Sequence, residues 1–279
     1  MSFALIALVL LAALLHAGWN GLLKSGGDRF RAIVIMSTAS GAACVPALAL
    51  LPMPAAASWP AILVSAALHI AYNLFLVAAY QYGDLGQVYP VARGASPLLV
   101  TLGALLLAGE HPDTLMLLGI ALVSFGIVSL AHGWNAGGPR KGLVVALTTG
   151  VLIACYTVTD GLGGRLSGAP VSYAAWLFVI DALPMPLIYW ATRRDGPALF
   201  DLSPATTRAA AGGLVSLAAY AIVIYAASIA PMGGVSALRE TSVVFAALIG
   251  KLFLDEVLTW RRLLACATVG AGAILLGYH

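Results

Sequence analysis

The chain has 279 residues, of which 61% are hydrophobic and only 9% are charged, and its formal net charge is +3. Soluble domains carry about 25% charged residues, so 14 basic and 11 acidic side chains are too few to cover a surface exposed to water. This composition excludes a soluble enzyme, a nucleic-acid binder and a disordered chain, and it indicates an all-α integral membrane protein.

Apolar runs long enough to cross a bilayer follow one another along the chain. A membrane helix needs about 20 apolar residues, and no loop between the runs has room for a soluble domain. Residues 1–16 lack the Lys or Arg with which a secretory signal begins, so we expect the first run to be a membrane helix. The runs predict ten helices, over residues 3–23, 31–51, 60–82, 86–108, 113–131, 142–160, 170–191, 207–229, 232–254 and 260–277.

Lys and Arg are distributed unequally between the two sides of these helices. The side opposite the N-terminus holds Lys24, Arg29, Arg31, Arg140, Lys141, Arg193, Arg194, Arg208, Lys251, Arg261 and Arg262, whereas the other side holds Arg165 alone. Cytoplasmic loops carry an excess of basic residues. The bias predicts that the first set is cytoplasmic and that both termini lie outside.

The chain contains an internal repeat. A shift of 146 residues places the fourth and fifth helices on the ninth and tenth, with Arg93 on Arg239 and Glu110 on Glu256, and a shift of 140 aligns the earlier helices. Two copies of five helices must cross the membrane in opposite senses, and transporters use such inverted repeats to open alternately on either side of a central site. We therefore expect repeat 1 at residues 1–131, a linker at 132–141 and the inverted repeat 2 at 142–279.

Two segments carry a resemblance to a known family. Leu105–Leu130 reads LLLAGEHPDTLMLLGIALVSFGIVSL, which is an apolar run, a Gly-Glu at the helix end, a short break and a helix dotted with glycine. Leu252–Leu276 reads LFLDEVLTWRRLLACATVGAGAILL, with Asp-Glu in place of Gly-Glu. The chain thus resembles, over nearly its whole length, the ten-helix EamA-type branch of the drug/metabolite transporter (DMT) superfamily.

The resemblance implies ten helices around a central cavity, with the fifth and tenth helices packed outside it. It implies export of small metabolites, and amino acids are a common cargo of the bacterial members, which lie in the inner membrane. Tyr89–Leu99, YPVARGASPLL, is similar to the family's fourth helix, whereas Val235–Glu240 in the second repeat has no proline. Glu110 and Glu256 match the family motif at helix ends, so we expect them to be structural.

Ionisable residues within a bilayer are candidates for a functional site because they are costly to bury. Arg93 and Arg239 approach the midplane from opposite faces, and a guanidinium group suits bidentate contact with a substrate carboxylate. The alternative is an internal ion pair, for which Glu240 is a neighbour of Arg239. Asp181, in the middle of the seventh helix, is a candidate for proton coupling or a partner for a buried arginine. Asp160 is expected to be an interfacial cap.

Polar and aromatic side chains recur on single helix faces. His69, Tyr72, Asn73 and Tyr80 share a face of the third helix, which favours a wet cavity over packing. Aromatic walls with a few hydrogen-bonding groups suit a small amphipathic zwitterion, and they suit a planar drug equally well. The candidate substrate-binding residues are His16, Trp19, Asn20, His69, Tyr72, Asn73, Tyr80, Tyr89, Arg93, Tyr156, Trp176, Tyr220 and Arg239.

Four prolines interrupt the helical hydrogen-bond ladder and are candidate hinges, although proline is common in membrane helices. Two lie in the fourth predicted helix and two in the seventh: Pro90, Pro97, Pro184 and Pro186.

Other functions meet objections in the sequence. An intramembrane aspartyl protease would need a Gly-x-Gly-Asp context, and zinc or serine hydrolases would need HExxH or G-x-S-x-G, none of which occurs. Three cysteines, odd in number and without ligand spacing, indicate neither disulfides nor a metal site. We expect a secondary transporter that is not an enzyme and that has no cofactor or metal. Its expected partners are a small-molecule substrate, membrane lipid and, for coupling, protons. A drug or other metabolite exporter of the same fold is the alternative, followed by a channel or membrane-embedded enzyme.

Overall fold

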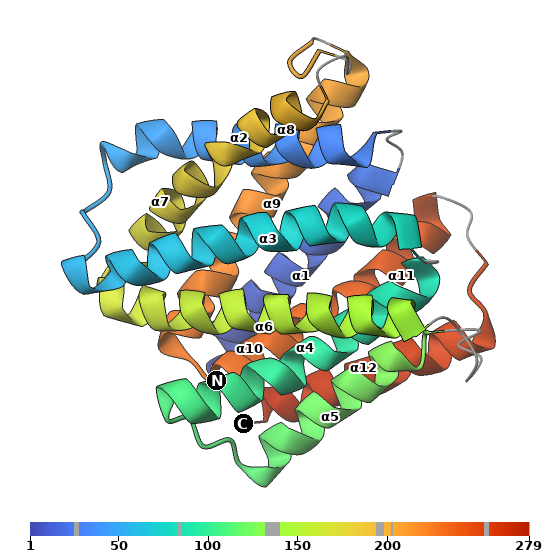
Figure 1. The fold of residues 1–279 in the computed structure, drawn as a ribbon. Coiled ribbons are helices and arrows are strands. Elements are labelled where there is room, and N and C mark those ends of the chain that lie inside the picture. The colour runs from blue at the N-terminus through green and yellow to red at the C-terminus, as the bar shows by residue number, and fades with distance from the viewer. Residues whose placement is uncertain are drawn as a thin grey trace.

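A computed structural model of the chain describes residues 1–24, 28–82, 85–131, 140–193, 198–201, 203–253 and 257–278, without the side chains of residues 22–24, 76–82, 85–89, 140, 141 and 253. All regular secondary structure in these ranges is helical, and both termini lie at the same end of the bundle (Figure 1). The helices are α1 (Phe3–Lys24), α2 (Arg29–Leu48), the 3-10 turn η1 (Ala56–Ser58), α3 (Trp59–Tyr82), α4 (Leu85–Ala108), α5 (Thr114–Val128), α6 (Arg140–Ser167), α7 (Pro170–Ala182), α8 (Pro184–Thr192), α9 (Pro204–Ile229), α10 (Met232–Arg239), α11 (Ser242–Phe253) and α12 (Trp260–Gly277).

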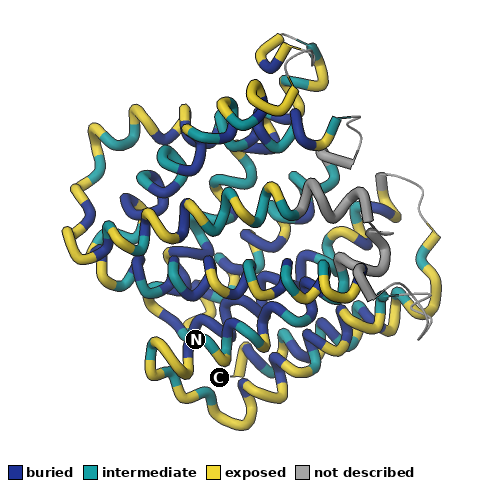
Figure 2. Tube along the Cα trace, in the orientation of Figure 1, coloured by how far each residue is buried: buried dark blue, intermediate teal, exposed yellow. Residues whose placement is uncertain are grey.

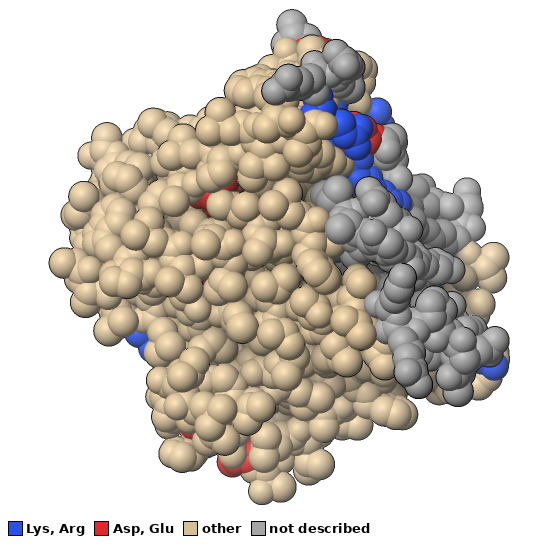
Figure 3. Space-filling view, in the orientation of Figure 1, with Lys and Arg blue, Asp and Glu red and all other residues tan. Residues whose placement is uncertain are grey.

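The lengths and composition of these helices suit a bilayer. Nine segments of the described residues are long and apolar enough to cross a membrane, and α5 is a shorter apolar helix. Most of the surface on the face in Figure 3 is uncharged, and most of the visible Lys and Arg side chains gather along one edge. The prediction of an all-α membrane protein with ten helices is confirmed. Most of the expected linker, residues 132–139, lies outside the described residues.

Local sequence explains where several helices begin and end. Asp113 caps α5, since its carboxylate accepts a hydrogen bond of 2.8 Å from the backbone N–H of Met116. Gly109 and Gly168 follow α4 and α6 with φ of +65° and +64°, a left-handed conformation that glycine adopts without strain and that commonly ends a helix.

Two predicted helices are each divided into two segments. The predicted helix 170–191 forms α7 and α8, which meet at Leu183, because Pro184 has no N–H to continue the ladder. The predicted helix 232–254 forms α10 and α11, which meet at Glu240 and Thr241. There the Thr241 hydroxyl donates to the carbonyl oxygen of Leu238 at 2.7 Å and satisfies part of the interrupted backbone.

The prediction that the sixth helix ends at residue 160 is wrong, because α6 continues to Ser167. The three glycines that follow Asp160 do not break it but allow close packing, with Gly161 against Met232, Gly163 against the Tyr173 ring and Gly164 against α9. Asp160 therefore lies inside the helix and is buried, and it is not an interfacial cap.

Exposed residues lie mainly at the periphery of the bundle and buried residues mainly on its inner faces (Figure 2), and the buried apolar residues of the described ranges form three clusters. The largest apolar cluster brings together α1, α4, α5, α6, α9, α10 and α12. The helices α5 and α12 pack against each other along one side of the bundle (Figure 1). The two helices thus lie at one side of the bundle and not at its centre.

Candidate functional site

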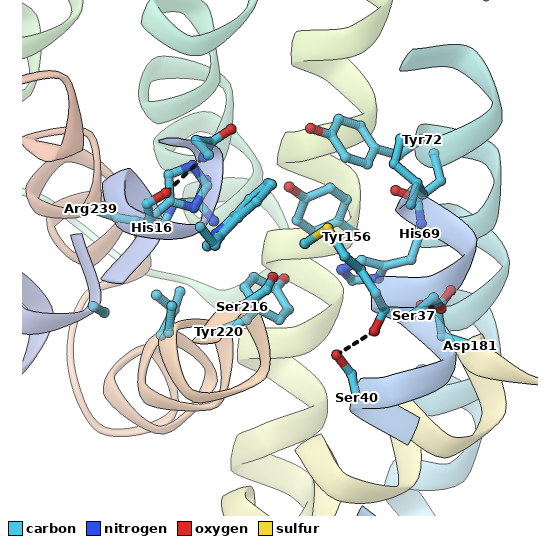
Figure 4. Close-up of a pocket in the computed structure, with 18 of the residues that line it drawn as sticks. His16, Ser37, Ser40, His69, Tyr72, Tyr156, Asp181, Ser216, Tyr220 and Arg239 are labelled. Atoms are coloured by element: carbon cyan, nitrogen blue, oxygen red, sulfur yellow. Dashed lines mark hydrogen bonds between the residues drawn. The ribbon is translucent and has the colours of Figure 1, made fainter. Parts of the chain in front are cut away.

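A cavity of about 550 Å³ lies among the helices. Side chains from α1, α2, α3, α4, α6, α7, α9 and α10 line it, and α12 contributes Arg262. Figure 4 shows His16 and Arg239 on one side of the cavity, Asp181 and Ser37 on the other, and Tyr156 between them. The cavity thus has two differently charged sides.

The cationic side is a buried cluster of two arginines and one glutamate. Arg93 Nε lies 2.8 Å from Glu240 Oε2, and Arg239 Nη2 lies 3.3 Å from Glu240 Oε1. The side chains of Arg93 and Arg239 are each 3% exposed and that of Glu240 is fully buried. Both arginines are thus buried, and the ion pair considered as an alternative is present for both.

His16 joins this cluster from α1. Its Nε2 lies 3.1 Å from Arg93 Nη2, and a guanidinium group only donates hydrogen bonds, so this imidazole nitrogen accepts and the ring is neutral. One turn later, the Asn20 side chain donates to the His16 carbonyl oxygen at 2.8 Å, and the Trp19 ring contacts the imidazole edge-on at 5.0 Å between centroids. All three residues line the cavity.

The acidic side is formed by Asp181 on α7. The Ser37 hydroxyl donates to Asp181 Oδ2 at 3.2 Å, whereas Oδ1 has no hydrogen-bond partner among the described residues. Asp181 is 7% exposed and lines the cavity. A buried carboxylate oxygen without a donor is costly, so this side offers an acceptor to a ligand.

Aromatic rings from three helices separate the two sides. The His69 imidazole stacks on Tyr156 at 4.2 Å between centroids, and Tyr72 and Tyr220 contact Tyr156 edge-on. Tyr220 donates to Asp160 Oδ2 at 2.6 Å, so the ring is fixed from behind. These rings provide an apolar wall with hydroxyl groups at its edge.

Asp160 lies behind this wall and is held by two phenols. Tyr173 donates to Asp160 Oδ1 at 3.0 Å, while Tyr220 binds the other oxygen. Asp160 and Tyr173 do not line the cavity, and Tyr220 does. The network therefore supports the cavity wall from outside.

Most of the candidate residues from the sequence come together in this cavity, and one does not. The residues found in its wall are His16, Trp19, Asn20, His69, Tyr72, Asn73, Arg93, Tyr156, Tyr220, Arg239 and Asp181. Trp176 is not among the lining residues, because its ring packs against Trp59 at 5.1 Å between centroids. The side chains of Tyr80 and Tyr89 lie outside the described residues, as does Glu256.

The candidate hinge prolines occupy different settings. Pro90 lies within α4 and lines the cavity, and Pro97 lies two turns further along the same helix. Pro184 begins α8 directly after the break at Leu183, and Pro186 follows in the first turn of α8.

Several lining residues were not predicted from the sequence. They are Ala12, Arg29, Ile33, Met36, Ser37, Ser40, Phe178, Ser216, Ala219, Val223 and Arg262. Arg262 also corrects the expectation that the tenth helix lies wholly outside the cavity. Arg29, Ile33 and Ser37 follow one another at four-residue intervals, which places them on one face of α2. This spacing is the signal in the sequence that could have identified them as lining residues.

Outside the cavity, two charged clusters join the helix ends. Glu110 forms an ion pair with Arg165 and accepts a hydrogen bond of 2.9 Å from the Met232 backbone N–H, which joins the ends of α4, α6 and α10. At the opposite end, hydrogen bonds from Thr206 and Ser203 hold the pKa of Asp201 well below its usual range, and Arg31 adds an ion pair at 3.0 Å. Glu110 thus occupies a linking position away from the cavity.

Comparisons with known proteins agree on the fold class. Residues 140–278 match the model of the EamA-like transporter family. The fold is similar to that of a solved structure whose title reads only "Crystal structure of protein". The TM-score is 0.76 and the sequence identity is 19%, over 98% of this chain and 94% of that chain. A search of the curated proteins found no significant match. No group of three or more His, Cys, Asp or Glu in the described residues is placed to hold a metal ion.

Proposed function

The chain belongs to the EamA-like transporter family, within the DMT superfamily, through its residues 140–278, and we propose that it is a secondary transporter that exports amino acids by alternating access. The observation that carries this proposal is the separation of charge in the cavity (Figure 4). Arg239 lines one side and Asp181 lines the other. An amino acid carries a carboxylate and an ammonium group, so the two sides complement its two ends.

The two ends of the site each retain hydrogen-bonding capacity. Arg239 Nε and Asp181 Oδ1 are buried and have no hydrogen-bond partner among the described residues. A substrate carboxylate that accepts from Arg239 and an ammonium group that donates to Asp181 would satisfy both atoms. A neutral planar drug can hydrogen-bond to these atoms but brings no charge opposite to that of Arg239 or Asp181, which favours amino acids over the alternative of drug export.

The walls between the charged sides suit an apolar or aromatic amino-acid side chain. Met36 and Phe178 provide apolar surface, and Tyr72 and Tyr156 provide ring faces. Small-molecule sites combine such walls with a few polar groups that fix orientation.

Contacts between α5 and α12 support the proposal that the chain is an inverted repeat. A Cβ atom on Gly119 would lie 3.1 Å from the carbonyl oxygen of Gly272, and one on Gly126 would lie 3.1 Å from that of Ala265. The shift of 146 residues places Gly119 on Ala265 and Gly126 on Gly272, so it converts the first pair of positions into the second. Reciprocal contacts of this kind mark a two-fold relation between halves, and inverted halves are the usual basis of alternating access.

The direction of transport and the coupling ion are further parts of the proposal. The excess of Lys and Arg opposite the termini supports a cytoplasmic position for those loops and an outside position for the termini, in a bacterial inner membrane. Asp181 is the proton-coupling candidate, because a proton on its carboxylate would remove the charge that attracts an ammonium group. Pro90 and the break before Pro184 are the positions at which the cavity wall is expected to bend.

Counterflow in liposomes tests the function. Purified protein is reconstituted into vesicles loaded with one unlabelled amino acid, and uptake of its labelled form is followed for neutral, aromatic and charged amino acids. We expect exchange of neutral amino acids, and loss of exchange for the matching amides and deaminated acids, which each lack one charge. Exchange of drugs but of no amino acid would contradict the proposed substrate class, and the absence of any exchange would contradict the carrier.

A further inference from the structure

We propose that Glu240 sets the charge of the solute that the cavity accepts, by neutralising one of the two buried arginines and leaving a site for a single anionic group. The inference rests on the proposed function, since it concerns selectivity among amino acids. Glu240 does not line the cavity itself. It acts on the solute through Arg93 and Arg239, and is therefore a positioning residue.

The geometry makes Glu240 a shared partner. Each of its two carboxylate oxygens faces a different guanidinium group, at 2.8 Å from Arg93 and at 3.3 Å from Arg239. Glu240 lies in the break between α10 and α11, directly after the last residue of α10, and Arg93 comes from α4. The ion pair therefore joins the two predicted repeats at the cavity wall.

The charges of the cluster do not cancel. Two guanidinium groups carry +2 and one carboxylate carries −1, so the three side chains together carry +1. His16, which faces the cluster from α1, is neutral because its Nε2 accepts from Arg93. The other charged groups on the cavity are Asp181 on the far side, and Arg29 and Arg262.

A net charge of +1 in a buried site favours a single anionic group. Charge interactions are stronger there than in water, because the local dielectric constant is low. A first carboxylate neutralises the cluster, whereas a second carboxylate on the same solute finds no further positive charge in the cluster and is repelled by Glu240. The first carboxylate is expected to bind at Arg239 Nε, which has no hydrogen-bond partner in the part of the chain that the structure describes.

A series of variants that changes only the cluster charge tests this inference. Glu240→Gln raises the charge to +2, Arg93→Gln lowers it to 0, and the double variant with both substitutions restores +1. Calorimetric titration of each purified protein in detergent measures the dissociation constants of leucine, with one carboxylate, and of glutamate, with two. Glu110→Gln is the matched control, because it removes the charge of another arginine-paired glutamate that lies outside the cavity.

We expect Glu240→Gln to shift the leucine-to-glutamate affinity ratio at least about ten-fold toward glutamate, a change that corresponds to about 1.4 kcal/mol. Arg93→Gln is expected to weaken the binding of both, and the double variant and Glu110→Gln to keep the wild-type ratio. Glu240→Gln removes the carboxylate that both buried arginines share, so this single variant could fail to fold. The comparison of Arg93→Gln with the double variant then tests the same inference without the single variant.

The two proposals fail in distinguishable ways. If the wild type binds leucine and the ratio is equal in every folded variant, Glu240 has only a structural role and this inference is overturned, while the proposed function stands. If the wild type binds neither amino acid, the proposed function is overturned and this inference with it.

Discussion

Two adjacent glycines on α9 predict opposite effects of the same substitution. A Cβ atom on Gly213 would lie 2.8 Å from Met36 Cα and 3.0 Å from Met36 C, which are backbone atoms of α2. A Cβ atom on Gly212 would meet only the end of the Met36 side chain, at 3.7 Å, an ordinary van der Waals distance. Gly213→Ala therefore forces the two helices apart, whereas Gly212→Ala does not.

The expected magnitudes follow from this geometry. Each alanine gains up to about 1 kcal/mol from helix propensity. At position 213 this gain is opposed by overpacking, about 1–3 kcal/mol, and by strain on the hydrogen bond of 2.8 Å from Ser40 to the Gly213 carbonyl oxygen, worth about 0.5–1.5 kcal/mol. We therefore expect Gly213→Ala to lower stability by up to about 3 kcal/mol, and Gly212→Ala to leave it equal or higher.

Thermal unfolding of both variants in detergent, followed by tryptophan fluorescence, measures the difference. Because Met36 and Ser40 line the cavity, Gly213→Ala is also expected to raise the half-saturating substrate concentration in counterflow, and Gly212→Ala to leave it unchanged. Equal melting temperatures for the two variants would refute the close approach of α2 and α9.

Three further substitutions distinguish the cavity from its supports. Trp176→Leu is expected to leave the half-saturating substrate concentration unchanged, because its ring packs on Trp59; a large increase would return Trp176 to the site. Asp181→Asn is expected to reduce exchange of amino acids at least about ten-fold without lowering the melting temperature, as one lost charge interaction implies; wild-type exchange would remove Asp181 from the site. Tyr173→Phe takes a donor from the buried Asp160 and is expected to cost about 1–3 kcal/mol of stability; an unchanged melting temperature would show that this bond contributes little.

The sequence was sufficient to predict ten membrane helices, although not all of their ends, because runs of about 20 consecutive apolar residues are typical of membrane-spanning helices. It also identified the rare charged side chains within the apolar runs, such as Arg93, Arg239 and Asp181, which all lie on the cavity. The contact of Arg93 with Glu240 was not predicted as such, because it joins α4 to the break after α10, and the sequence does not give distances between helices.

The errors have equally physical reasons. Trp176 was assigned to the cavity because tryptophan suits both a binding site and an interface, and the sequence of α7 does not determine which face turns inward. Asp160 was assigned to a helix end because the glycines after it resemble a break, whereas they are packing contacts within α6. Ser40 and Ser216 were missed because single serines in a membrane helix satisfy their hydroxyls locally and give no pattern.

Alkylation of a single cysteine in the cavity tests most directly whether the transported solute binds there. Cys44, Cys155 and Cys266 are replaced by alanine and Ser216, which lines the cavity, by cysteine. We expect an exchanged amino acid to slow alkylation of Ser216→Cys, with half of the effect at the concentration that half-saturates counterflow. An alkylation rate that does not change while the same protein continues to exchange the amino acid would contradict this expectation.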